Sequence, residues 1–197
     1  MSLLVLAAAA VQATGAPTIA ITGFAGEIRI EQGETLSARV ERADPDEPVS
    51  IEETGAGLVI DGGRDMRSWR CRGGWRETRV GPRRGEARPF DELPLLIITT
   101  PEPAALDLDD SIVRARAGDL AALDLGLAHC GAFQAGMIAG DARLGLSGSA
   151  DVSLGALGGD AAVAISGSSD VTLGDVAGAL TVSISGSGDV QTGDAAS

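Results

Sequence analysis

A 19-residue repeat in the C-terminal half is the feature that most restricts how this chain can fold. Three segments with the pattern apolar-Ser-Gly-Ser-x-Asp-Val align without gaps and begin 19 residues apart, at Leu146, Ile165 and Ile184. Within each period, apolar residues alternate with small or polar ones, as in a β-strand with one buried face. A unit this short cannot bury its own apolar face, so neighbouring units must stack on one another.

The alternating positions form columns when the periods are superposed. We expect these columns to be Leu106, Leu125, Leu144, Val163 and Val182; Leu108, Leu127, Leu146, Ile165 and Ile184; Phe133, Val152, Val171 and Val190; and Ala135, Leu154, Leu173 and Thr192. The pattern predicts an all-β fold, a parallel β-solenoid (β-helix) with regular coils over residues 104–197. An immunoglobulin-like sandwich is the alternative, but it requires no fixed period.

Residues 17–103 carry shorter strand patterns, which we expect to cap the N-terminal side of one continuous domain, 17–197. Apolar residues alternate around residues 19–21, 28–30, 36–40, 49–51 and 58–60, with turn-forming residues between them. Residues 64–91 break the pattern and are expected to form one long Arg-rich loop. An apolar strand from Leu93 to Thr100 follows this loop.

Residues 1–16 predict a signal peptide. Residues 3–13 form an apolar run that ends in small residues and is too short to span a bilayer. A buried first strand or helix is the alternative. No other stretch reaches the ~18 apolar residues of a transmembrane helix. We therefore expect export, to the periplasm, the outer membrane surface or the extracellular space.

The repeat turns resemble those of the head GIN domain family of auto-transporter adhesins. The resemblance rests on the Ser-Gly-Ser-Gly-Asp-Val repeats, on Ile28-Arg-Ile-Glu-Gln-Gly33 and on the strand ending Ile98-Thr-Thr-Pro101, and it covers about residues 18–197. It implies a β-solenoid exported to the bacterial envelope, with no established activity and no catalytic residues to transfer. The chain departs from the pattern in its Arg-rich loop and in Ala128-His129-Cys130, which replaces Ser-Gly-Ser in the second coil.

The composition argues against several classes of enzyme. The chain contains no Lys, a single His and two Cys, which excludes lysine nucleophiles, the P-loop lysine and zinc sites rich in His or Cys. We expect His129 to be a surface or hydrogen-bonded residue, and we expect no catalytic residue and no cofactor. A carbohydrate-active enzyme on a β-helix is the alternative, and it would need a pair of Asp carboxylates in a groove, one of them with a raised pKa.

The Arg-rich segment is the main candidate for ligand binding. Residues 64–88 hold nine Arg and three acidic residues, a net +6 in a chain whose remainder is −19. The candidate residues are Arg67, Trp69, Arg70, Arg72, Trp75 and Arg76, since Arg and Trp bind anionic glycans by charge and stacking. The favoured interpretation is intramolecular, with Arg paired to Asp of the solenoid and Trp covering an apolar edge. A surface glycan is the partner we expect, and nucleic acid is not, given the net charge of −13 and export.

Asp residues recur at two corners of the repeat, Asp151, Asp170 and Asp189 at one and Asp141 and Asp160 at the other. Asp is short enough to accept hydrogen bonds from backbone N–H groups two residues away, so we favour turn capping as its role. Calcium-stabilised repeats are the alternative, because carboxylates stacked about 5 Å apart repel one another unless a cation lies between them.

The two Cys residues predict one disulfide, Cys71–Cys130, since an even number of Cys in an exported chain is usually paired. Cys130 stands where later coils carry Ser149, Ser168 and Ser187, at a turn that a loop outside the stack can reach. Two unrelated free thiols are the alternative.

The last coil ends in an open strand edge with unpaired backbone groups. We expect either that the chain continues or that C-terminal ends associate end to end. A structural subunit that polymerises through this end is a third functional possibility, beside the non-catalytic adhesin-like or scaffold module that we favour and the enzyme.

Overall fold

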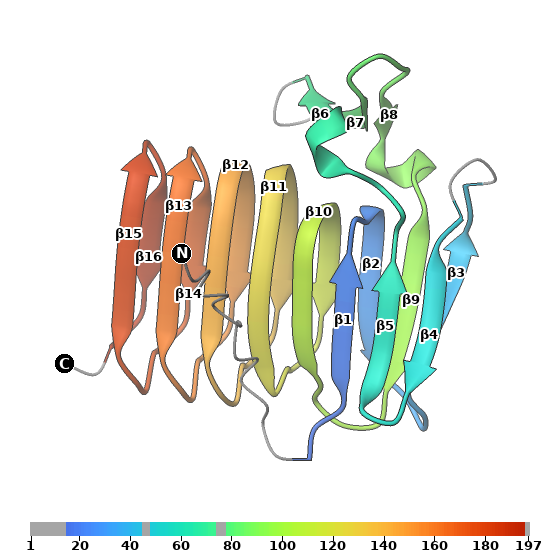
Figure 1. Cartoon of the computed structure of the whole chain (residues 1–197). Helices are drawn as coiled ribbons and strands as arrows, with labels where there is room; N and C mark the ends of the chain where they lie inside the picture. Colours follow the sequence, from blue (N-terminus) through green and yellow to red (C-terminus); the bar gives the residue numbers. More distant parts are fainter. Residues whose placement is uncertain (1–14, 45–47, 74–77, 196–197) are drawn as a thin grey trace, which may run out of the picture.

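The computed structural model describes residues 15–44, 48–73 and 78–195, and in these ranges the chain is all-β. Thirteen strands join in one hydrogen-bonded sheet in which most pairs are parallel, and three further strands form a small antiparallel sheet (Figure 1). The described residues include no helix long and apolar enough to cross a membrane. Of the expected signal peptide, residues 1–14 lie outside the described ranges.

The C-terminal half is built from seven strands that occupy corresponding positions in successive repeats. They are β10 (Ala105–Ala117), β11 (Ala122–Ala135), β12 (Ala142–Leu154), β13 (Ala161–Gly167), β14 (Asp170–Leu173), β15 (Leu180–Gly186) and β16 (Asp189–Thr192). From β11 onward the repeats stack in parallel at steps of 19 residues, as predicted. Leu144 pairs with Val163 and Val163 with Val182, and after the turn Val152 pairs with Val171.

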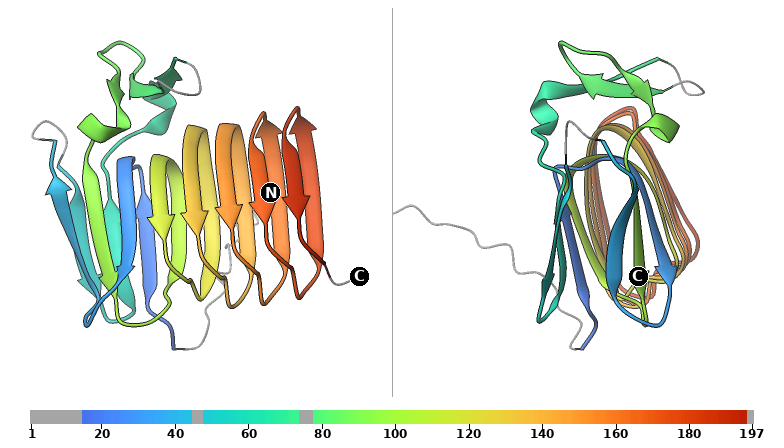
Figure 2. Two further views of the ribbon diagram at one scale, coloured as in Figure 1. Left: turned by 180° about the vertical axis from the view of Figure 1, so that it is seen from behind. Right: turned by 90° about the vertical axis from the view of Figure 1, so that its right-hand side faces the viewer.

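A third line of contacts closes each repeat on the side away from these strands. It consists of single-residue parallel bridges that join Leu120, Ile138, Leu157, Val176 and Ala195 in series. Seen along the stacking direction, the repeats superpose as one flattened loop (Figure 2, right). The apolar columns point into this loop, where Val163 and Ile165 are each 2% exposed. The main hydrophobic core is therefore one continuous column of Leu, Ile and Val along the stack.

The register of the first repeat differs from the prediction. Leu108, not Leu106, pairs with Leu125, and Ser111, not Leu108, pairs with Leu127. The register shifts between Leu108 and Ser111, where Asp110 has a φ of 43°. The Ser111 hydroxyl is fully buried there, donates to the carbonyl of Asp109 at 2.7 Å and accepts from the Phe24 N–H at 3.2 Å. This β-bulge shortens the first repeat on one side and leaves the buried face unchanged.

The N-terminal strands extend the same stack. They are β1 (Thr18–Thr22), β2 (Ala25–Gln32), β3 (Ser37–Arg42), β4 (Ser50–Thr54), β5 (Gly57–Asp61) and β9 (Leu95–Thr100). The predicted strands are all present. β1 and β5 continue the β10 side of the stack in parallel, and β2 and β9 continue the other side. The antiparallel strands β3 and β4 then pair with β9 and β5 and end the stack.

The prediction of one long loop over residues 64–91 is wrong. The segment folds into η1 (Met66–Ser68), β6 (Trp69–Arg72), β7 (Arg79–Pro82), β8 (Arg88–Pro89) and η2 (Phe90–Glu92), hereafter the small sheet. It has its own core, in which Met66, Trp69, Val80 and Phe90 pack on Ile112 of the stack. Its strands span only two to four residues, too few to show alternation, and single apolar anchors separate its Arg residues.

Candidate functional site

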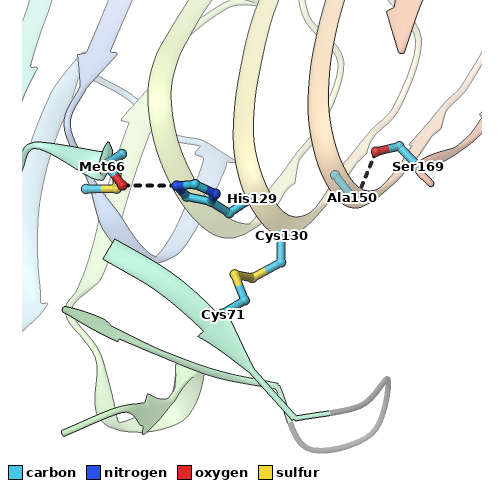
Figure 3. The surroundings of a disulfide bond; sticks show 6 residues. All are labelled: Met66, Cys71, His129, Cys130, Ala150 and Ser169. Atoms are coloured by element: carbon cyan, nitrogen blue, oxygen red, sulfur yellow. Dashed lines mark hydrogen bonds between the residues drawn. A yellow bond between two sulfur atoms is a disulfide. The ribbon is translucent and has the colours of Figure 1, made fainter. Parts of the chain in front are cut away.

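The small sheet lies over one corner of the stack, where the chain turns between the two long sides (Figure 1). This corner comprises residues 147–149, 166–168 and 185–187, with Ala128-His129-Cys130 as the equivalent in β11. Cys71 of β6 is disulfide-bonded to Cys130, and their Cα atoms lie 6.2 Å apart (Figure 3). This is the pairing predicted from the sequence, and it joins the small sheet to the second repeat.

His129 provides a second tie at the same corner. It is in register with Gly148, and the next repeats carry Gly167 and Gly186 at this position. Those glycines have φ values of 131–146°, whereas His129 has a φ of 67°, a left-handed conformation that costs a side-chain-bearing residue about 1 kcal/mol or more. In return, His129 Nε2 donates a hydrogen bond of 3.1 Å to the carbonyl of Met66 in η1 (Figure 3). His129 is thus a hydrogen-bonded residue of the fold, as expected.

A groove of about 590 Å³ runs between the small sheet and this corner. Its floor comes from three neighbouring strands of the stack, because Arg114 of β10 pairs in register with Ala132 of β11, and Ala132 with Asp151 of β12. Its roof comes from Arg70, Cys71, Gly73 and Thr78. Its end is lined by the corner residues His129, Gly148 and Ser149. The volume is that of a site for one small ligand or a short part of a polymer.

The groove places positive and negative side chains at known separations. Arg114 and Asp151 stand two strand spacings apart, about 10 Å, with the small Ala132 between them. The Arg114 guanidinium lies 5.0 Å from the centre of the Phe90 ring, and Arg70 Nη2 donates to the carbonyl of Arg83 at 2.7 Å. Both side chains are exposed. The groove therefore offers two oriented guanidinium groups and one carboxylate.

Burial raises the pKa of Asp151 above its ordinary value of 3.8, and the neighbouring Asp170 carboxylate raises it further. Asp170 is the next member of the same column and pairs in register with Asp151. A second pair behaves alike on the opposite side of the stack, where burial and then Asp124 and Asp109 raise the pKa of Asp107. Stacking one Asp above another in a parallel sheet thus has a measurable electrostatic cost.

The predicted ligand-binding residues divide between the groove and the rest of the small sheet. Arg70 lines the groove. Trp69 is 4% exposed and packs in the core beneath the Arg64 guanidinium, so it covers an apolar edge as the intramolecular interpretation expected. Arg67 is exposed in η1, and Arg72 donates to the carbonyls of Arg83 and Gly85. The candidates Trp75 and Arg76 lie outside the described residues.

The expected pairing of Arg with Asp of the repeats is wrong for the described part of the Arg-rich segment. None of its Arg side chains forms an ion pair with an Asp of residues 104–195. Arg88 pairs instead with Asp44, which precedes the repeats. Arg79, like Arg70 and Arg72, donates to a carbonyl of the small sheet, here that of Ala87. These Arg side chains hold the short strands together, where backbone ladder bonds are few.

Asp residues at the far corner do cap backbone N–H groups, but across repeats and not within a turn. Asp119, Asp141, Asp160 and Asp175 each accept a bond of 2.8–2.9 Å from an N–H group 18 or 19 residues later. The expected partner two residues away is therefore wrong. These bonds join each repeat to the next in the same direction as the sheet ladder.

The column of Asp151, Asp170 and Asp189 has a different environment. Within the described residues, none of these three carboxylates accepts a hydrogen bond or forms an ion pair, so turn capping is wrong for this column. The described ranges also contain no group of three or more Asp, Glu, His or Cys side chains arranged to hold a metal ion. The column is a line of like charges along the surface.

Asp151→Asn is expected to raise the thermal midpoint at pH 7 by about 1–3 °C, because relieving one solvent-screened like-charge contact is worth less than about 1 kcal/mol. The raised pKa of Asp151 makes its contribution to stability fall as the pH rises from 3.8 through the folded-state pKa. The gain should therefore vanish below about pH 4, where the carboxyl is protonated in both states.

The contrasting variant is Asp160→Ala, which removes the acceptor of the Ala179 N–H and should lower the midpoint at pH 7. Thermal denaturation between pH 3 and pH 8 measures both effects. A gain from Asp151→Asn that persists at pH 3 would contradict the electrostatic cause.

Arg114, Ser149 and Thr78 line the groove but were not among the predicted site residues. Arg114 belongs to the repeats, where only three Arg occur among residues 104–197. Given the Cys71–Cys130 pairing, the position one strand before Ala132 would have identified it. That step needed the register of the first repeat, which the sequence pattern misplaced.

Residues 25–196 match the family model described as "Putative auto-transporter adhesin, head GIN domain". The match includes the stack from β2 onward, the Arg-rich segment and both walls of the groove. The resemblance in the repeat turns is therefore confirmed. A comparison with curated proteins finds no matching relative.

Proposed function

The chain belongs to the head GIN domain family of putative auto-transporter adhesins, and from this premise we propose that it is a non-catalytic, adhesin-like binding module of the bacterial envelope. Its scaffold is a parallel β-solenoid that presents the groove beneath the small sheet. The ligand is an acidic sugar within an envelope or surface glycan. The observation that carries this proposal is the groove itself, with Arg70 and Arg114 opposed across about 590 Å³.

The solenoid scaffold is supported by the register of the strands. Parallel pairs at 19-residue steps run on both long sides, from β11 to β15 and from β12 to β16, and bridges run along the third side. A chain that advances by one strand spacing per period on three sides follows a helical path. Such a scaffold is rigid along its length and holds residues of different repeats at fixed separations.

An acidic sugar suits the chemistry of the groove. A guanidinium group binds a carboxylate through two parallel hydrogen bonds, and Arg70 and Arg114 are both exposed to the groove. Asp151 can accept hydrogen bonds from sugar hydroxyl groups, and the Ser149 and Thr78 hydroxyls can donate or accept. The groove concentrates positive charge in a chain of net charge −13, so it attracts anions locally.

The geometry favours binding over hydrolysis of the sugar. A glycosidase needs two carboxyl groups on either side of the scissile bond. Asp151 has the raised pKa that an acid requires, but Asp170 is its neighbour in one column and so stands on the same side of any ligand. Among the described residues that line the groove, Asp151 supplies the sole carboxylate.

Export is supported by two features of the chain. Residues 1–16 have the length and composition of a signal peptide. The Cys71–Cys130 disulfide requires an oxidising compartment to form and persist. Together with the family, they place the module in the periplasm, on the outer membrane surface or outside the cell.

The test is an array of uronate-containing, sialylated and neutral oligosaccharides, probed with the full chain. We expect binding to acidic members and not to neutral ones of equal length. Arg70→Ala with Arg114→Ala should weaken it about tenfold or more, because each charge-assisted bond contributes about 1.5–3 kcal/mol. Titration calorimetry with the best acidic oligosaccharide measures the loss.

Arg143→Ala is the matched control, since Arg143 is an exposed Arg of β12 that does not line the groove. It changes the net charge by one unit and should leave affinity within about twofold. Thermal denaturation of each variant separates loss of binding from loss of fold. Equal binding of neutral and acidic sugars, or equal losses in the groove variants and the control, would overturn the proposal.

A further inference from the structure

The C-terminal end of the stack exposes residues that are buried in every earlier repeat. Val182 and Ile184 of β15 are 41% and 43% exposed, whereas their partners Val163 and Ile165 on β13 are 2% exposed. The strand pairs with β13 along one edge, and its other edge faces outward. The end therefore combines an apolar surface with a row of backbone groups able to pair with another strand.

The opposite end of the stack is protected against such pairing. Its outermost strands β3 and β4 carry charged, exposed side chains at Arg39, Glu41, Glu52 and Glu53. Charged residues are the usual means by which edge strands avoid pairing with other chains. The sequence of β15, Leu-Thr-Val-Ser-Ile-Ser-Gly, contains no charge and is rich in β-branched residues. The two ends are thus not complementary, which disfavours head-to-tail growth.

The C-terminal edge is complementary to itself. When two copies of the seven-residue β15 pair antiparallel with full overlap, the two-fold axis passes through Ser183. Val182 of one copy then lies opposite Ile184 of the other, so both point inward and the apolar columns continue across the junction. The other end of this sheet already accepts antiparallel strands, because β3 pairs with β9 and β4 with β5 in this sense.

We infer that the protein forms a tail-to-tail dimer in which β15 pairs antiparallel with β15 of a second copy about a two-fold axis at Ser183. The paired strands carry no charge, and each copy has a net charge of −13. Repulsion between the copies opposes association, and salt screens it. The dimer should therefore strengthen as salt rises, the opposite of an interface held by ion pairs.

Sedimentation velocity of the full chain over a range of concentrations tests this inference. We expect a monomer–dimer equilibrium that shifts toward dimer between about 20 and 300 mM NaCl. Ser183 is exposed and points outward, so Ser183→Glu leaves the fold intact and sets two carboxylates opposite each other at the axis. It should weaken the dimer about tenfold or more, since directly opposed like charges destabilise a strand pair.

Ser183→Lys should weaken the homodimer equally, and an equimolar mixture of the Glu and Lys variants should restore association as a heterodimer. The control is Ala164→Glu, because Ala164 is exposed and in register with Ser183 one strand inward from the edge. It should change the dimer constant by less than about twofold. A monomer under all conditions, open-ended oligomers, or a mixture that fails to restore the dimer would overturn the inference.

Discussion

Replacing Val163 with Asp is expected to unfold the repeat region, because it puts a charge into a closed apolar column. Val163 is 2% exposed and lies between Leu144 and Val182. The change forfeits about 1.5–3 kcal/mol of apolar burial and adds several kcal/mol for an unpaired buried carboxylate. The sum approaches the whole stability of a typical domain, about 5–15 kcal/mol. Ile165→Asp should have the same effect.

Circular dichroism during thermal denaturation measures the result, and we expect either no folded baseline or a midpoint lowered by more than about 10 °C. Ala162→Asp is the matched control, because Ala162 is the preceding residue, is exposed and has Arg143 as its register partner. It adds the same charge to the outer face and should change stability by less than about 0.5 kcal/mol. An unchanged midpoint for Val163→Asp would contradict the inward orientation of this column.

The regular part of the stack could be predicted because two periods agree there. Alternation with period 2 identifies the inward residues, and the 19-residue period identifies their partners. For Val163 both arguments lead to the same neighbours, Leu144 and Val182, which the strand register confirms. Each repeat thus supplies an independent copy of the same evidence.

The first repeat could not be placed in the same way. Leu residues recur at every second position in both strands, at 106 and 108 and at 123, 125 and 127. A shift by two residues keeps the apolar face inward, so the pattern cannot distinguish the two registers. The choice depends on the bulge at Asp109–Ser111, where a buried Ser hydroxyl bonds to the backbone. Nothing in the alternation signals that bulge.

The candidate site was only partly accessible for a related reason. The Cys count predicted which part of the stack the Arg-rich segment contacts, and so placed Arg70 near Cys130. The small sheet itself was missed, because its anchors Met66, Trp69 and Phe90 stand singly between Arg residues. Its stability derives from packing on Ile112 and from Arg side chains that bond to carbonyl groups, and neither leaves a periodic pattern.

Removing the Cys71–Cys130 disulfide is expected to have the second largest effect, a loss of up to about 4 kcal/mol in the free energy of unfolding. The bond closes a loop between residues 59 apart in the sequence, and the chain-entropy model gives about this value for such a loop. The loss should also reach the groove. Cys71 belongs to its roof and Cys130 to its floor, so the two walls would be held together mainly by the His129–Met66 hydrogen bond.

Cys71→Ser with Cys130→Ser should therefore lower the denaturation midpoint and weaken acidic-sugar binding together, whereas the spectrum of the repeat region should persist. His129→Gly is the control for the corner, since it removes the second tie but keeps the disulfide and relieves the left-handed φ of 67°. Its effect should be smaller, about 1 kcal/mol or less. Thiol titration of the unfolded, unreduced protein checks the premise. Two free thiols per chain would contradict the bond, and they would also remove one of the two supports for export.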